Sequence, residues 1–125
     1  MRSSLAVAVG AALGAGGRWA VAEALSGGRF PWPTLLVNLA GCAAIGAASV
    51  RLRRGTDLWY FCVTGLLGGF TTASTFGVET RDLLADGRAV TAAGYVAASV
   101  LGGIAAVSWT QAATLRATGD QAVTA

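Results

Sequence analysis

Residues 65–76 are the part of this sequence whose composition most directly suggests chemistry, because three glycines and four hydroxyl residues interrupt an otherwise apolar segment. Glycine lowers helix propensity, and hydroxyl side chains offer the backbone competing hydrogen bonds. We therefore predict that a helix breaks here, and its freed carbonyl oxygens could hold a hard cation such as Na⁺. The alternative is a continuous helix whose glycines pack against a neighbour and whose hydroxyls bond to their own backbone.

Neutral hydrogen-bonding side chains recur at one-turn spacing in two other apolar segments. Thr34 precedes Asn38, and Tyr95 precedes Ser99, so each pair lies on one face if its segment is helical. Asn38 could instead do no more than tie two helices together. With the hydroxyls of residues 71–75, the two pairs predict a polar track through an apolar protein.

The predicted track carries no Lys, His, Asp or Glu at the centre of an apolar segment. Cation paths and proton-coupled transporters generally use carboxylates, carbonyl rings or titratable groups near the bilayer midplane. Neutral donors instead suit a small, strongly hydrated anion that must exchange water for protein hydrogen bonds, and the positive edge of the Phe76 ring can assist them. These residues predict a pathway for a small anion.

Enzymatic chemistry is not expected from this sequence. It has no histidine and no recognisable pairing of a nucleophile with a base. Cys42 and Cys62 lie singly in apolar segments without the spacing of metal ligands, so we interpret them as small apolar residues at helix contacts.

The composition indicates that a bilayer surrounds these residues. Hydrophobic residues make up 54% and charged residues 12% of the chain, against roughly 25% charged residues in soluble domains. A membrane-spanning helix needs ~20 apolar residues, and three charge-free segments qualify: residues 30–50, 58–78 and 89–115. Residues 5–25 are a fourth candidate, which carries Arg18 and Glu23 towards its end. This segment could also be a cleaved secretory signal, but Arg18 interrupts its apolar run. We predict one all-α membrane domain over residues 1–125, with disorder after Arg116.

Arginines are divided unequally between the two predicted sides of the membrane. Five accompany the termini and three lie opposite: Arg2, Arg51, Arg53, Arg54 and Arg116 against Arg29, Arg81 and Arg88. This excess predicts that both termini lie on the cytoplasmic side of a bacterial cell membrane.

Small residues recur at every fourth position in the first and fourth predicted helices: Ala6, Gly10 and Gly14, then Gly94, Ala98 and Gly102. Such rows allow helix backbones to approach closely inside a membrane. Four spans of this size can hardly enclose an aqueous path alone, so a transport function predicts a dimer.

Three motifs, in order, resemble the Fluc family of fluoride channels, also called CrcB, along nearly the whole chain. They are GAGGRW at residues 14–19, TLLVNLAG at residues 34–41 and GGFTTASTF at residues 68–76. The resemblance implies an antiparallel dimer with two narrow fluoride pores. It also implies a structural Na⁺ at the dimer interface, bound by the backbone carbonyls of Gly68 and Thr71 from each subunit. The implied activity is passive fluoride export, which lowers the fluoride concentration of the cytoplasm.

The same resemblance implies roles for individual residues. Arg18 is expected near an aqueous vestibule, and the expected pore residues are Thr34, Asn38, Thr75, Phe76, Tyr95 and Ser99. Ala73 stands where the family usually has the first of two phenylalanines, so a pore built from this chain alone is expected to conduct poorly. Together with the arginine bias, this favours a heterodimer with a second Fluc-like chain over a homodimer.

Two other functions fit the same sequence. A small multidrug-resistance exporter also has four short helices in an antiparallel dimer, but it needs a titratable carboxylate within the first helix. Only Glu23, near the end of that helix, is available. A non-conducting partner or assembly protein would use Asn38 and the broken helix only to stabilise an interface.

Overall fold

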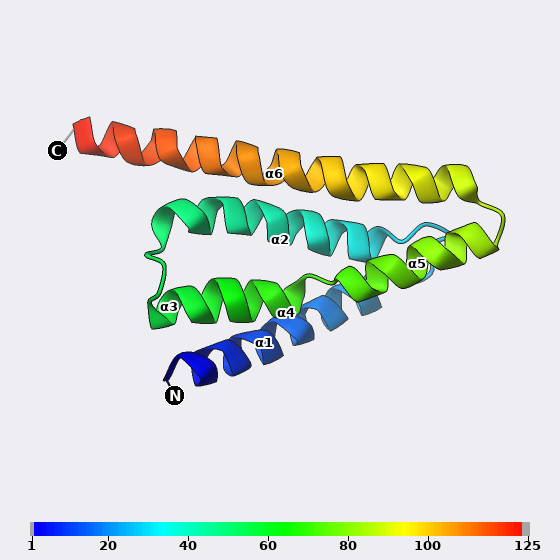
Figure 1. Cartoon of the computed structure of the whole chain (residues 1–125), viewed down its shortest axis with the longest axis horizontal. Coiled ribbons are helices and arrows are strands. Elements are labelled where there is room, and N and C mark those ends of the chain that lie inside the picture. The colour runs from blue at the N-terminus through cyan, green and yellow to red at the C-terminus, as the bar shows by residue number, and fades with distance from the viewer. Residues whose placement is uncertain (1, 124–125) are drawn as a thin grey trace.

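The structure is a computed structural model that describes residues 2–123, which form helices running back and forth along one axis (Figure 1). The first two spans are α1 (Arg2–Ala24) and α2 (Trp32–Arg51), and the last is α6 (Ala89–Val123). The third span is composite and consists of α3 (Asp57–Trp59), the π-helix η1 (Tyr60–Leu67), α4 (Gly68–Phe70) and α5 (Ala73–Ala85). Within the described residues, four helical stretches are long and apolar enough to cross a membrane, which confirms the predicted all-α membrane architecture.

Two of the predicted helix ends are wrong. The third span continues past residue 78 to Ala85. The first charged residue of this extension, Glu79, is accommodated because Thr34 and Tyr95 donate to its carboxylate. Helix α6 continues past Arg116 to Val123, where disorder was predicted. Its threonines bond to their own helix, with Thr118 Oγ1 donating to the carbonyl of Thr114 at 3.0 Å, so polar residues extend the helix there instead of ending it.

Short turns connect the spans and fix where the helices begin. The turns contain glycines at positive φ, a conformation that side-chain-bearing residues rarely adopt: Gly27, Gly55 and Gly87. Thr56 caps the start of the third span, where its hydroxyl accepts a hydrogen bond from the backbone N–H of Trp59 at 3.2 Å. These signals make the chain reverse at each end of the bundle.

Glycines bring α1 and the first half of the third span into backbone contact. A methyl group added to Gly14 would collide with the carbonyl oxygen of Leu66, and one added to Gly69 would collide with that of Ala11. A methyl on Gly65 would lie 2.7 Å from the carbonyl oxygen of Val7. Inside a membrane, where apolar burial gives little drive for association, such close approach is what holds helices together.

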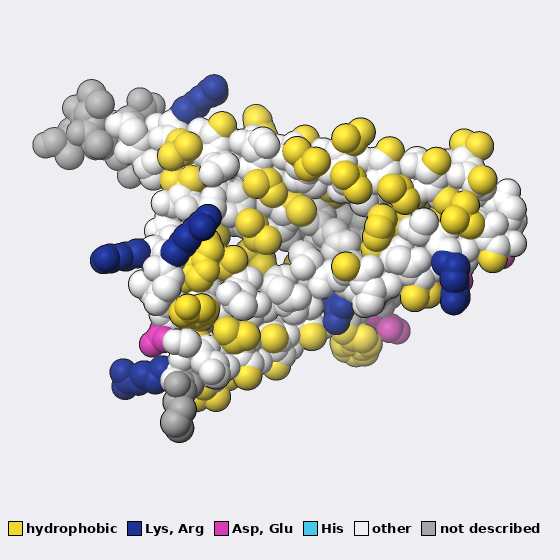
Figure 2. Space-filling model, in the orientation of Figure 1, with side chains coloured by type: hydrophobic (Ala, Val, Ile, Leu, Met, Phe, Trp, Pro, Cys, Tyr) yellow, Lys and Arg dark blue, Asp and Glu magenta, His cyan; other side chains and the backbone are white. Residues whose placement is uncertain are grey.

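Helix α6 packs chiefly on α2, so the bundle consists of two tightly packed helix pairs (Figure 1). Few side chains are buried between them, and large apolar side chains cover the outside, as the yellow surface of Figure 2 shows. Leu101, for example, is 67% exposed. A soluble monomer rarely exposes so large an apolar surface, so this surface fits lipid or a second chain.

Candidate ion pathway

The third span leaves the helical conformation at Thr71 and Thr72. Both residues have extended backbone, with φ −77° and ψ 158° at Thr71 and φ −146° and ψ 119° at Thr72. Helix α5 then starts with its own cap, because the Thr72 hydroxyl accepts a hydrogen bond from the backbone N–H of Thr75 at 3.2 Å. The segment that the sequence singled out for its glycines and hydroxyls thus contains two consecutive non-helical residues.

Asn38 on α2 binds this junction through both atoms of its amide. Its Nδ2 donates to the carbonyl oxygen of Thr72 at 3.0 Å, and its Oδ1 accepts from the backbone N–H of Thr72 at 2.8 Å. Thr72 is buried, so the amide supplies partners that water cannot provide there. Asn38 therefore links two spans, and its second N–H is still available to another acceptor.

The break releases the carbonyl oxygens of residues 68–71 from the helical pattern, and for Gly68 and Thr71 the replacement partner of the lost donor is known. In a continuous α-helix, the N–H of residue 72 would bond to the carbonyl of Gly68, and the N–H of residue 75 would bond to the carbonyl of Thr71. Here the first N–H donates to Asn38 and the second to the Thr72 hydroxyl. Among the described residues, the carbonyls of Gly68 and Thr71 accept no backbone hydrogen bond across this junction.

The carbonyls of Gly68 and Thr71 are among the oxygen atoms that this junction could offer to Na⁺. Gly68 is exposed on the single chain, and a methyl added there would meet nothing nearer than 3.9 Å. Carbonyl oxygens suit a hard cation. The described residues contain no cluster of three or more His, Cys, Asp or Glu side chains that could form another kind of metal site.

Glu79 on α5 joins two of the predicted pore residues, and the sequence prediction missed it. Thr34 Oγ1 donates to Glu79 Oε1 at 2.9 Å, and the Tyr95 hydroxyl donates to Glu79 Oε2 at 2.7 Å. The predicted third span stopped at residue 78, one residue too early, so the track seemed to lack a carboxylate. Helical spacing would have found Glu79, because it lies one turn after Phe76 and Thr75.

Aromatic rings surround the Tyr95 side chain, which is 0% exposed. Its ring centroid lies 5.1 Å from that of Phe76 and 5.6 Å from that of Phe30, in the latter case edge to face. This packing holds the Tyr95 hydroxyl against Glu79 and places Phe76 beside the polar track.

Ser99 and Asn38 face the same cavity, of ≈ 310 Å³, which we call the Ser99 cavity. The Ser99 hydroxyl is buried and has no hydrogen-bond partner among the described residues. A buried donor without a partner is uncommon in proteins and often marks the position of a water or an ion. Phe76, Ala73 and Cys42 also line this cavity.

Arg18 lines a second cavity, of ≈ 240 Å³, which we call the Arg18 cavity. Thr34 and Thr75 also face it, and Thr72 lines both this cavity and the Ser99 cavity. A half-buried guanidinium can attract anions to this cavity. The predicted site residues therefore cluster around Thr72, with Arg18 on one side and Ser99 on the other.

Residues 5–111 match the protein family described as "CrcB-like protein, Camphor Resistance (CrcB)". The chain belongs to the CrcB family. The resemblance that the three motifs suggested is thus confirmed, and with four apolar spans the CrcB chain is a multi-pass membrane protein.

Relatives of this CrcB chain are named as ion channels and not as enzymes. It is 44% identical over 114 residues to the "Fluoride-specific ion channel FluC" of Chloroflexus aurantiacus, covering 86% of this chain and 90% of the relative. It is 48% identical over 105 residues to the protein of the same name from Bordetella petrii, covering 81% and 82%. The corresponding protein of Paracoccus denitrificans is 48% identical over 108 residues, covering 82% and 86%. These names agree with the expectation that the chain is not an enzyme.

Proposed function

We propose that this chain forms a fluoride-selective channel that lets fluoride leave the cytoplasm passively. The observation that carries the proposal is the pair of cavities that meet at Thr72, one with Arg18 at its side and the other with the unpartnered Ser99 hydroxyl. The arrangement offers an anion a guanidinium in one cavity and the neutral donors Asn38 and Ser99 in the other, with the Glu79 carboxylate held by Thr34 and Tyr95. The names of the 41–48% identical relatives support fluoride as that anion.

Selectivity follows from which donors remain available to an ion. The hydroxyls of Thr34 and Tyr95 already donate to Glu79, so an anion passing them must take one of these hydrogens away from a carboxylate. Ser99 and the second N–H of Asn38 need no such exchange. A small anion such as fluoride forms the strongest hydrogen bonds and can compete for these donors, whereas a larger anion such as chloride regains less of its hydration energy.

A structural Na⁺ at a dimer interface is part of the proposal. Its support is that the carbonyls of Gly68 and Thr71 lose their helical donors to Asn38 and Thr72. Two carbonyls are fewer than the six or so oxygens that hard cations take, and an equivalent pair from a second chain would bring the number of carbonyl ligands to four. Replacing Na⁺ with the large cation N-methylglucamine is expected to shift the purified protein from dimer to monomer, measured by mass photometry in detergent.

We further propose an antiparallel dimer in the bacterial cell membrane with both termini of this chain in the cytoplasm. The exposed apolar side chains leave room for a partner, and the arginine excess at the terminal side favours one fixed orientation. A fixed orientation and Ala73 both favour a heterodimer with a second chain of the same family. A homodimer remains the alternative partner arrangement, and robust fluoride efflux by the pure chain would support it.

Fluoride efflux from liposomes that contain the pure chain tests the proposed activity, with chloride efflux as the reference. We expect fluoride to leave and chloride to remain, and Asn38→Asp to abolish the flux while the dimer persists. Ser99→Ala is expected to slow fluoride efflux. Ser49→Ala is the matched control, because the Ser49 hydroxyl bonds to its own helix at the Gly46 carbonyl. Equal flux of both halides would refute selectivity.

The exporter alternative needs a proton-binding carboxylate, and the observation in its favour is the partly buried Glu79. An exporter would move its substrate only with a proton gradient, whereas a channel conducts fluoride down its own gradient at equal pH on both sides. A non-conducting subunit would give no flux alone but would restore it when a second family member is present.

A further inference from the structure

The net side-chain charge of the molecule resides at one end of the bundle. Five arginines and two aspartates lie at the end that carries the termini: Arg2, Arg51, Arg53, Arg54 and Arg116, with Asp57 and Asp120. Four arginines and four carboxylates lie towards the opposite end: Arg18, Arg29, Arg81 and Arg88, with Glu23, Glu79, Asp82 and Asp86. The second group sums to zero, so the whole formal charge of +3 belongs to the first, which we call the arginine end.

Among the side chains that the structure describes, no ion pair lies at the arginine end. Among the described residues the ion pair lies at the other end, between Arg81 and Asp82, where Arg88 Nη1 also donates to the carbonyl oxygen of Arg29 at 2.6 Å. At the arginine end, the Asp57 carboxylate accepts from the Ser3 hydroxyl at 3.1 Å instead of from an arginine. Arg54 lies over the Trp59 ring, 5.5 Å from its centroid. Figure 2 shows dark blue side chains spread over this end.

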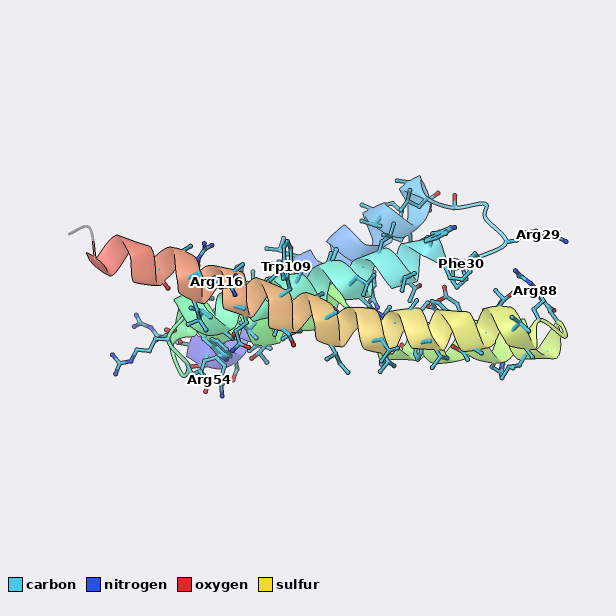
Figure 3. The ribbon with its side chains drawn as sticks, turned by 90° about the horizontal axis from the view of Figure 1, so that it is seen from above. Arg29, Phe30, Arg54, Arg88, Trp109 and Arg116 are labelled. Atoms are coloured by element: carbon cyan, nitrogen blue, oxygen red, sulfur yellow. The ribbon has the colours of Figure 1, made fainter. Side chains whose placement is uncertain are left out.

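Helix α6 fixes how deep these arginines lie in a bilayer. At about 1.5 Å per residue, the helix from Ala89 to Arg116 is about 40 Å long, close to the thickness of a bilayer with its headgroups. Trp109 lies about 10 Å inside Arg116 and is 76% exposed, as expected for a tryptophan at the membrane interface. Arg54 and Arg116 lie at the same end of the molecule, beyond Trp109 (Figure 3). Their guanidinium groups are therefore at the level of lipid phosphates.

We propose that the arginine end binds anionic phospholipid headgroups, with Arg51, Arg53 and Arg54 of the α2–α3 turn as its centre. A guanidinium group binds phosphate oxygens in a bidentate manner, and clusters of basic residues beside a membrane helix attract anionic lipids. Lipid is favoured over a free phosphate because the arginines lie at headgroup depth beside an interfacial tryptophan. None of these residues lines the Arg18 or Ser99 cavity, so the proposal is independent of the ion pathway.

Quenching of tryptophan fluorescence by brominated lipids tests this proposal directly. The full-length chain, with Trp19 and Trp32 replaced by phenylalanine, reports through Trp59 and Trp109 near the arginine end. It is reconstituted in phosphatidylcholine vesicles that contain increasing amounts of brominated phosphatidylglycerol, and brominated phosphatidylcholine serves as the reference lipid. We expect phosphatidylglycerol to be preferred, with the preference falling roughly fivefold for each arginine removed.

Two triple variants locate the effect. R51Q/R53Q/R54Q removes three charges at the arginine end and is expected to abolish the preference, whereas R29Q/R81Q/R88Q removes three charges at the other end and is expected to retain it. R51K/R53K/R54K keeps the three positive charges and is expected to retain the lipid preference. This result would show that the glutamine variant loses lipid binding through loss of charge and not through misfolding. Circular dichroism monitors the folding of each variant. Equal loss in both glutamine variants, or no preference in the parent chain, overturns the proposal. Full displacement of the lipid by millimolar inorganic phosphate would also overturn it, in favour of a free-anion site.

Discussion

Replacing Asn38 with leucine should loosen the junction between α4 and α5 by an amount that follows from two hydrogen bonds. Leucine has the same branched shape as asparagine but is larger, and it leaves the N–H and the carbonyl of Thr72 without the partners that lie at 2.8 and 3.0 Å. Thr72 is only 7% exposed, so water cannot fully replace them. An unsatisfied buried polar group costs about 1–3 kcal/mol, so losing both partners should destabilise the junction by roughly 2–6 kcal/mol.

Hydrogen–deuterium exchange of the Thr72 amide measures this effect locally. Loss of the acceptor alone, at about 1–3 kcal/mol, should accelerate exchange of that amide between roughly fivefold and a hundredfold. Asn38→Asp retains an acceptor for the Thr72 N–H but sets a carboxylate oxygen against the Thr72 carbonyl, so its Thr72 amide should exchange more slowly than in the leucine variant. If Thr72 exchanges at the parent rate in Asn38→Leu, while Ser49→Ala is also unchanged, the amide does not hold the junction and our reasoning is wrong.

Three further substitutions probe other contacts. Gly14→Ala should destabilise the bundle by about 1–3 kcal/mol, because the added methyl meets a backbone oxygen of the third span. The control Gly16→Ala, whose methyl meets nothing within 4 Å, should be neutral or slightly stabilising. Thermal unfolding in detergent compares the two variants. Tyr95→Phe removes a hydrogen bond to a carboxylate and should lower the stability by about 1.5–3 kcal/mol, and an unchanged unfolding temperature would show that Glu79 finds another donor. Ala73→Phe adds a ring to the wall of the Ser99 cavity and should increase fluoride efflux by the pure chain in the liposome assay; slower efflux would indicate that the ring obstructs the cavity.

The apolar composition was sufficient to predict four spans, because the insertion of each span depends on the transfer of its own side chains from water to the bilayer. The ends of the spans were harder to predict for the same reason. A hydropathy argument stops at the first charge, yet Glu79 lies inside the third span because Thr34 on α2 and Tyr95 on α6 donate to its two oxygens. Those partners belong to other helices and cannot be identified from the local sequence.

At the candidate site too, the features set by local composition could be predicted, whereas those set by contacts between helices could not. The density of glycines and hydroxyls identified the segment that contains Thr71 and Thr72, since it reflects a local weakness of the helix. The role of Asn38 depends on which backbone group lies opposite it, and the sequence left open whether it serves an ion or a helix contact. In the structure it bonds to Thr72, a tertiary contact that spacing along α2 does not determine.

The backbone contact between α1 and η1 limits how this molecule can change shape. The contact also includes α4, and at Gly10, Gly14, Gly65 and Gly69 main chain meets main chain, with no side chain that could change rotamer to absorb a shift. Sliding or rotating either helix would drive main-chain atoms into one another, so the two helices behave as one rigid body. Rings and hydroxyls that face the cavities can still turn, and such torsions occur far faster than the tilting of whole helices.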